Sequence, residues 1–62
     1  MKKKEIINRL KRDLHEYGLM ILEDERYISM NDGKVCDSYK EVAFARQCIH
    51  EYIKKTLKAI ED

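Results

Sequence analysis

Hydrophobic positions follow a helical period at both ends of the chain and a shorter period in the middle. In residues 2–17 apolar side chains recur at three- and four-residue steps, which predicts an amphipathic helix. Its expected core face consists of Ile6, Ile7, Leu10, Leu14 and Tyr17. Gly18 follows, and we expect the helix to end there because glycine adopts the left-handed conformation common at helix C-termini.

A second amphipathic helix is expected over residues 38–60, which contain no Gly or Pro. The sequence Ser38-Tyr39-Lys40-Glu41 has the form of a capping box, in which Ser38 accepts the Glu41 amide and the Glu41 carboxylate reaches back. The expected core face contains Val42, Ala45, Ile49, Tyr52, Ile53, Thr56, Leu57 and Ile60. The pattern therefore predicts a long helix with one buried face.

The segment between these helices contains short apolar runs that favour strands. Leu19–Leu22 suits a buried strand, and Tyr27–Met30 alternates as a half-buried strand does. The charged residues 23–26 between them form either a turn or the exposed middle of one long strand. The Asp32-Gly33 pair then predicts a hairpin turn, because a type I′ turn needs positive φ at both central residues.

Residues 35–37 would form a last short strand, which gives the order α-β-β-β-α, or α-β-β-α if the first two strands are one. The fold class predicted for residues 1–62 is a single two-layer α+β domain, with both helices packed on a small antiparallel sheet. The second helix would span about 34 Å and a strand roughly 17 Å, so the helix has more apolar length than the sheet covers. The apolar surface of the second helix that the sheet leaves open must pack against the first helix, a second copy or a partner.

Composition excludes several classes of function. The 62 residues carry 13 basic and 12 acidic side chains, a net charge of +1, so no overall field drives the chain toward nucleic acid or an anionic membrane. The lysines at the start are not followed by the apolar run of a signal peptide, and no stretch is long enough to span a bilayer. We expect a cytoplasmic protein without a membrane partner.

The side chains that could bind a metal are poorly spaced for it. Cys36, Cys48, His15 and His50 include no CxxC or CxxH pair, and Cys48 and His50 would lie about 200° apart on a helix. The cysteines are expected to be free, Cys48 in the core, and His50 to lie on the surface. A nucleophile elbow and a P-loop are also missing from the sequence. We therefore expect no catalytic residues, no metal and no cofactor.

The pattern favours a noncatalytic protein-binding module that forms a homodimer through the long helix and also binds an unidentified protein. The residues expected at the partner or dimer interface are Phe44, Ile49, Tyr52, Ile53, Leu57 and Ile60. The Pro-free, Lys- and Ile-rich composition resembles that of short phage and mobile-element products. That resemblance implies an inhibitor or regulator that occludes a larger host protein.

The alternative is a small nucleic-acid-binding protein that uses the basic first helix and an exposed sheet face. A tyrosine among basic side chains can stack a base while its neighbours neutralise phosphates. The residues that would do this are Lys3, Lys4, Arg9, Arg12, Tyr27 and Lys34. This alternative predicts an affinity that falls steeply with salt.

Overall fold

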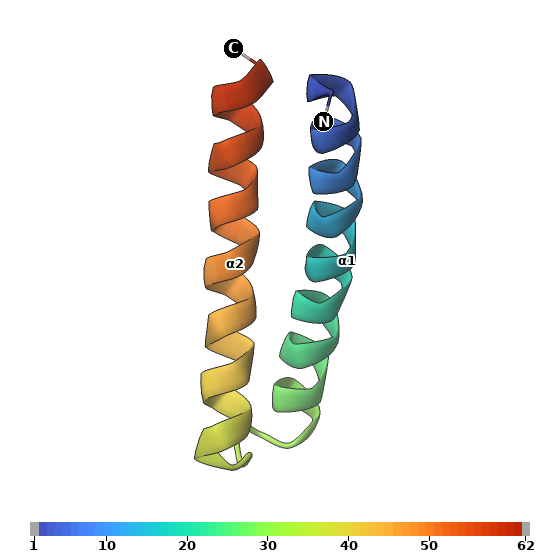
Figure 1. Cartoon of the computed structure of the whole chain (residues 1–62). Helices are drawn as coiled ribbons and strands as arrows, with labels where there is room; N and C mark the ends of the chain where they lie inside the picture. Colours follow the sequence, from blue (N-terminus) through green and yellow to red (C-terminus); the bar gives the residue numbers. More distant parts are fainter. Residues whose placement is uncertain (1, 62) are drawn as a thin grey trace.

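The computed structural model describes residues 2–61 and consists of two long antiparallel helices joined by a short loop (Figure 1). Helix α1 spans Lys3–Met30 and helix α2 spans Asp37–Glu61. Residues 2–61 contain no strand. The predicted α+β fold is therefore wrong, in both strand orders, and the chain is an all-helical hairpin with principal extents of 44 × 18 × 14 Å.

Helix α1 continues through Gly18 and through both predicted strand segments, because the residues that face α2 keep a regular helical spacing along its whole length. These positions alternate at three- and four-residue steps and are all buried or half-buried: Ile7, Leu10, Leu14, Tyr17, Ile21, Asp24 and Ile28. The runs Leu19–Leu22 and Tyr27–Met30 are successive turns of this helix. Leu, Met, Glu and Arg are strong helix formers, which supports the helix where strands were expected.

Helix α2 presents a matching row to α1. The inward positions are Tyr39, Ala43, Arg46, His50, Ile53, Leu57 and Ile60. We call these two facing rows the seam. The expected core face of this helix was partly wrong, because Val42, Ala45, Ile49 and Tyr52 are exposed whereas Ala43 is buried. The sequence pattern had merged the seam with a neighbouring row.

The loop of residues 31–36 contains the two positive φ angles that were predicted, 52° at Asp32 and 75° at Gly33. The two residues that have these angles end helix α1 and do not join two strands. The Gly33 amide donates to the Ile28 carbonyl at 2.8 Å and the Asp32 amide to the Ser29 carbonyl at 3.1 Å, which is a Schellman motif. The predicted backbone conformation is confirmed, and the predicted β-hairpin is wrong.

Helix α2 begins one residue earlier than expected. The Cys36 carbonyl accepts the amides of Tyr39 and Lys40, at 3.1 and 3.2 Å, so Cys36 occupies the cap position. Ser38 lies inside the first turn, with its hydroxyl 3.3 Å from the Cys36 sulfur. The capping box expected at Ser38 and Glu41 is therefore wrong.

Candidate protein-binding surface

A polar cluster closes the seam near the loop. Asp24 is only 4% exposed, and its Oδ1 accepts hydrogen bonds from Arg46 Nη1 at 2.7 Å and from the Tyr39 hydroxyl at 3.0 Å. Asp24 Oδ2 is buried without a hydrogen-bond partner in the part of the chain that the structure describes. Because these partners meet in one register only, the cluster fixes how α1 and α2 align.

The cluster also perturbs a titratable group. Desolvation, followed by the hydrogen bond to Asp24, raises the pKa of the Tyr39 phenol, so Tyr39 remains a neutral donor to high pH. The Tyr39 ring packs on that of Tyr27, with ring centroids 4.7 Å apart. At the start of α2, a hydrogen bond with Ser38 lowers the pKa of the exposed Cys36 thiol.

The residues considered for metal binding lie apart. His50 is half-buried in the seam, where a Cβ at Gly18 would lie 3.7 Å from His50 Nε2, so its expected surface position was wrong. Cys36 and Cys48 are free and exposed, so the core position expected for Cys48 was also wrong. Within residues 2–61 the structure contains no group of three side chains able to hold a metal ion.

The six residues expected at an interface fall into two sets. Ile53 and Leu57 are each 7% exposed and Ile60 is half-buried, because all three pack in the seam against α1. The first helix thus covers the apolar length that a sheet would have left open. Phe44, Ile49 and Tyr52 are exposed, by 66%, 41% and 73% respectively.

The seam separates two flanks of the hairpin. A residue one position before a seam position points about 100° away from it, to one side, and a residue one position after points to the other side. On the second side Lys11 of α1 pairs with Glu61 of α2 at 3.3 Å. The α2 row on that side, the charged flank, is Lys40, Phe44, Gln47, Glu51, Lys54, Lys58 and Glu61.

The first side carries an uncharged α2 row beside the seam: Val42, Ala45, Ile49, Tyr52, Thr56 and Ala59. The register set by Asp24 and Arg46 places Met20 and Tyr27 of α1 next to this row. Met20 is 37% exposed, Tyr27 48% and Val42 49%. We call this row together with Met20 and Tyr27 the apolar flank.

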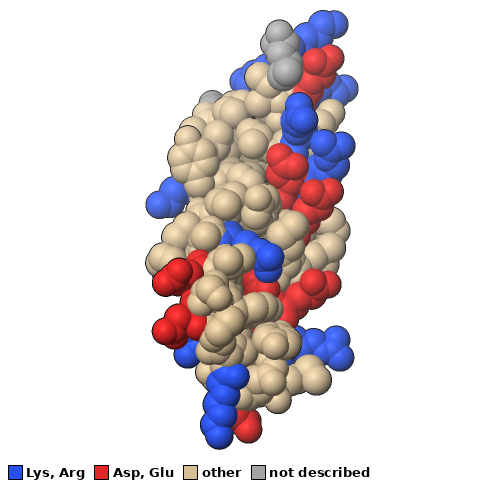
Figure 2. Space-filling model, turned by 60° about the horizontal axis from the view of Figure 1, so that its bottom comes forward, with Lys and Arg blue, Asp and Glu red and all other residues tan. Residues whose placement is uncertain are grey.

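The apolar flank lies on the face turned to the viewer in Figure 1. Figure 2 views that face obliquely from the loop end and shows uncharged side chains over most of its middle. Acidic and basic side chains gather mainly along its edges. On α1 the row one position before the seam, which contains Met20 and Tyr27, also contains the charged residues Arg9, Asp13, Glu16 and Glu23. The apolar flank is therefore uncharged on α2, whereas on α1 its apolar side chains Met20 and Tyr27 lie among charged ones.

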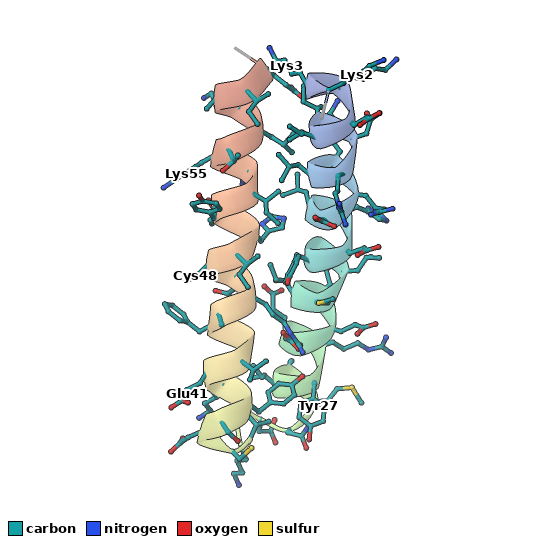
Figure 3. The ribbon with its side chains drawn as sticks, in the orientation of Figure 1. Lys2, Lys3, Tyr27, Glu41, Cys48 and Lys55 are labelled. Carbon is teal, nitrogen blue, oxygen red and sulfur yellow. The ribbon has the colours of Figure 1, made fainter. Side chains whose placement is uncertain are left out.

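A second apolar surface, which shares Tyr52 with the apolar flank, lies on the outside of α2. Phe44, Cys48 and Tyr52 follow one another at four-residue steps and, with Gln47, Glu51 and Lys55, line an open hollow of about 420 Å³. Cys48 and Lys55 point away from α1 (Figure 3). One helix alone forms this hollow, so it offers less contact area than the apolar flank.

The residues proposed for nucleic-acid binding do not form one surface. Lys3, Lys4, Arg9 and Arg12 are exposed on the first half of α1. Tyr27 and Lys34 lie near the loop, and Figure 3 shows Lys3 and Tyr27 at opposite ends of the hairpin. The sheet face on which Tyr27 was expected does not exist in residues 2–61.

The apolar flank was only partly anticipated from the sequence. Ile49 and Tyr52 were expected at an interface, whereas Met20 and Val42 were assigned to a strand and to the core. The signal that could have found them is the uncharged row from Val42 to Ala59, which alternates at three- and four-residue steps just as the seam does.

No protein-family model, curated protein or solved structure matches the chain. Within residues 2–61, neither helix has the length and apolar character needed to cross a membrane.

Proposed function

We propose that the protein is a noncatalytic binding module that uses its apolar flank to take up amphipathic helices and acts by covering or bridging protein surfaces. One observation carries this proposal. Both helices expose apolar side chains on the same flank, among them Met20, Ile49 and Tyr52. Contiguous apolar patches of this kind, rimmed by polar residues, are typical of protein interaction sites.

The shape of the flank suits a helical partner. The α2 row from Val42 to Ala59 lies parallel to the seam, and Met20 and Tyr27 lie on α1, on the other side of the seam. Amphipathic helices dock on such surfaces with anchors at three- and four-residue steps. Ala45 and Ala59 are small, so a partner helix can approach the α2 backbone closely.

The polar groups of the hairpin support a structural role for its most buried charge. Asp24 is 4% exposed and engaged with Arg46 and Tyr39 across the seam, so this carboxylate holds the helices together and is shielded from a substrate. The hollow at Phe44 and Cys48 is open and is formed by one helix. These features favour binding over catalysis.

The test is a displayed library of amphipathic helical peptides selected against the wild-type protein. We expect the selected peptides to lose at least about tenfold in affinity for Met20→Asp and Ile49→Asp, because each change puts a charge into an apolar contact. Leu22→Asp is the matched control, since Leu22 is 63% exposed and lies one position after the seam residue Ile21. The affinity of Leu22→Asp for the selected peptides should stay unchanged.

Two outcomes would contradict the proposal. One is equal peptide binding by the wild-type protein and both flank variants. The other is strong binding of oligonucleotides that weakens steeply with salt and is lost when Lys3, Lys4, Arg9 and Arg12 are replaced by Gln. The second outcome would move the function to the basic half of α1.

A further inference from the structure

We infer that the occupant of the apolar flank is a second copy of this chain, so that two hairpins pack flank to flank as a four-helix bundle. This inference rests on the proposed function, because it names the partner of the same surface. It follows from three properties of the hairpin: how little it buries, how its flank is spaced and where its charges lie.

The hairpin alone buries less than a domain of its size usually does. Its accessible surface is 5206 Å², whereas a folded monomer of 7.5 kDa has about 4,200 Å². Only Ala43, Ile53 and Leu57 form the buried hydrophobic core of the described chain. The excess, roughly 1,000 Å², compares with the about 800 Å² that each partner contributes to a standard interface. One dimer contact therefore accounts for the surface left over.

The spacing of the flank suits another helix of the same kind. The seam that joins α1 and α2 alternates at three- and four-residue steps, and the row from Val42 to Ala59 repeats that alternation one position earlier. Helices in four-helix bundles interlock through such rows. The flank thus offers a second copy the packing that already holds the hairpin together.

The charges also favour an isologous contact. The α2 row of the flank is uncharged along its whole length, so two copies related by a two-fold axis bring no like charges together at its centre. On the α1 side of the flank Arg9, Asp13, Glu16 and Glu23 lie in the same row as Met20 and Tyr27, so the two-fold contact is centred on the α2 rows. A contact centred there leaves the α1 charges at its margin, where they remain in water as charges at interface rims do.

Sedimentation equilibrium of the wild-type protein over micromolar to millimolar concentrations tests the inference. We expect a monomer–dimer equilibrium whose dissociation constant rises at least about a hundredfold in Ile49→Asp, because the charge enters a symmetric interface twice. Val42→Ser, a milder change at a 49% exposed position, should weaken the dimer by about tenfold or more. Circular dichroism at the same concentrations shows whether each variant stays helical.

Phe44→Asp is the matched control, because Phe44 is a 66% exposed aromatic residue on the other side of α2. Its dissociation constant should stay within about threefold of the wild-type value. A dimer that is lost in Phe44→Asp and kept in Ile49→Asp would move the interface to the outside of α2 and overturn the inference.

The outcomes separate the inference from the proposed function. A wild-type protein that is monomeric at every concentration overturns the second copy, whatever the variants do. If that monomer still binds helical peptides through Met20 and Ile49, the proposed function stands with another occupant. A flank-dependent dimer that binds no peptide supports the inference and limits the function to self-association.

Discussion

The same helix, α2, forms one side of both flanks, yet the two flanks differ in chemistry. On the charged flank its row contains Lys40, Lys54 and Glu61, and Glu61 pairs with Lys11 of α1. On the apolar flank the row from Val42 to Ala59 contains no charge at all. Water hydrates the side chains of the charged flank, whereas the apolar flank leaves apolar side chains exposed to water.

The two flanks therefore differ in how well the folded hairpin alone accounts for their side chains. Folding within one chain buries the seam and leaves the apolar flank exposed, which is the surface that the proposed second copy would cover. Which side chains lie on which flank depends on the register of the seam. The largest expected effects therefore come from the residues that set this register.

The largest loss of stability is expected from Arg46→Met. This change leaves the Asp24 carboxylate buried without its cation, and we expect the free energy of unfolding to fall by about 2–3 kcal/mol. That figure is below the range for fully buried pairs because the Arg46 side chain is 35% exposed. Urea unfolding followed by circular dichroism measures it.

The double variant Asp24→Leu/Arg46→Leu is the control for that prediction. Replacing both partners with apolar residues removes the buried charge as well, so its stability should return to the wild-type value or exceed it. If Arg46→Met were neutral, the pair would not hold the register, and the assignment of residues to flanks would lose its support.

Alanine substitutions at the two glycines should change the free energy of unfolding in opposite directions. Gly18 lies inside α1, and a Cβ there meets His50 Nε2 at an ordinary contact distance of 3.7 Å. Gly18→Ala should raise the free energy of unfolding by about 1 kcal/mol through helix propensity. Gly33→Ala should lower it by about 1 kcal/mol, because Gly33 has a φ of 75°.

Thermal unfolding of both glycine variants at one protein concentration measures the pair of effects. Changes of the same sign would contradict the structure at one of the two sites. A loss of stability at Gly18 would mean that α1 and α2 lie closer together at His50 than the seam described above allows.

Tyr39 provides a pH-dependent test of the seam. Its pKa is raised above the ordinary value of 10.0, so the stability that it contributes is fully present below pH 10 and is lost as the pH rises through the folded-state pKa. Tyr39→Phe removes the hydrogen bond to Asp24 and this alkaline loss together. Wild-type and variant stability should therefore differ below pH 10 and converge above it, as measured by urea unfolding between pH 8 and 11.

The smallest effect is expected on the charged flank itself. Lys11 and Glu61 are exposed, with 60% and 45% of their side chains accessible, so Lys11→Ala should change the free energy of unfolding by less than about 0.5 kcal/mol. Urea unfolding at low and high salt measures this. A larger, salt-independent loss would show that the charged flank contributes to the core.

The sequence predicted the two ends of the fold better than its middle. Residues 38–60 were expected to be helical and α2 spans Asp37–Glu61, while the positive φ angles at Asp32 and Gly33 were also anticipated. Two residues hid the continuity of α1. Gly18 has the local signature of a helix end, and Asp24 places a charge at a core position, where only the partners Arg46 and Tyr39 make it acceptable.

The sequence prediction assigned the residues of the apolar flank partly to the core and partly to an interface, for a related reason. Apolar residues of α2 occupy two adjacent rows, and the sequence of α2 alone does not say which row faces another part of the chain. That choice depends on α1 running the whole length of α2, which buries Ile53 and Leu57 and leaves Ile49 and Tyr52 exposed. Once the seam is known, the second row and Met20 identify the flank.

The most direct test of a second copy on the apolar flank is the melting temperature of the wild-type protein as a function of its own concentration. If a second copy covers the apolar flank, folding and association are linked, and the melting temperature should rise by several degrees over a hundredfold increase in concentration. A melting temperature that stays constant over that range would contradict the account, because the hairpin would then be complete as a monomer.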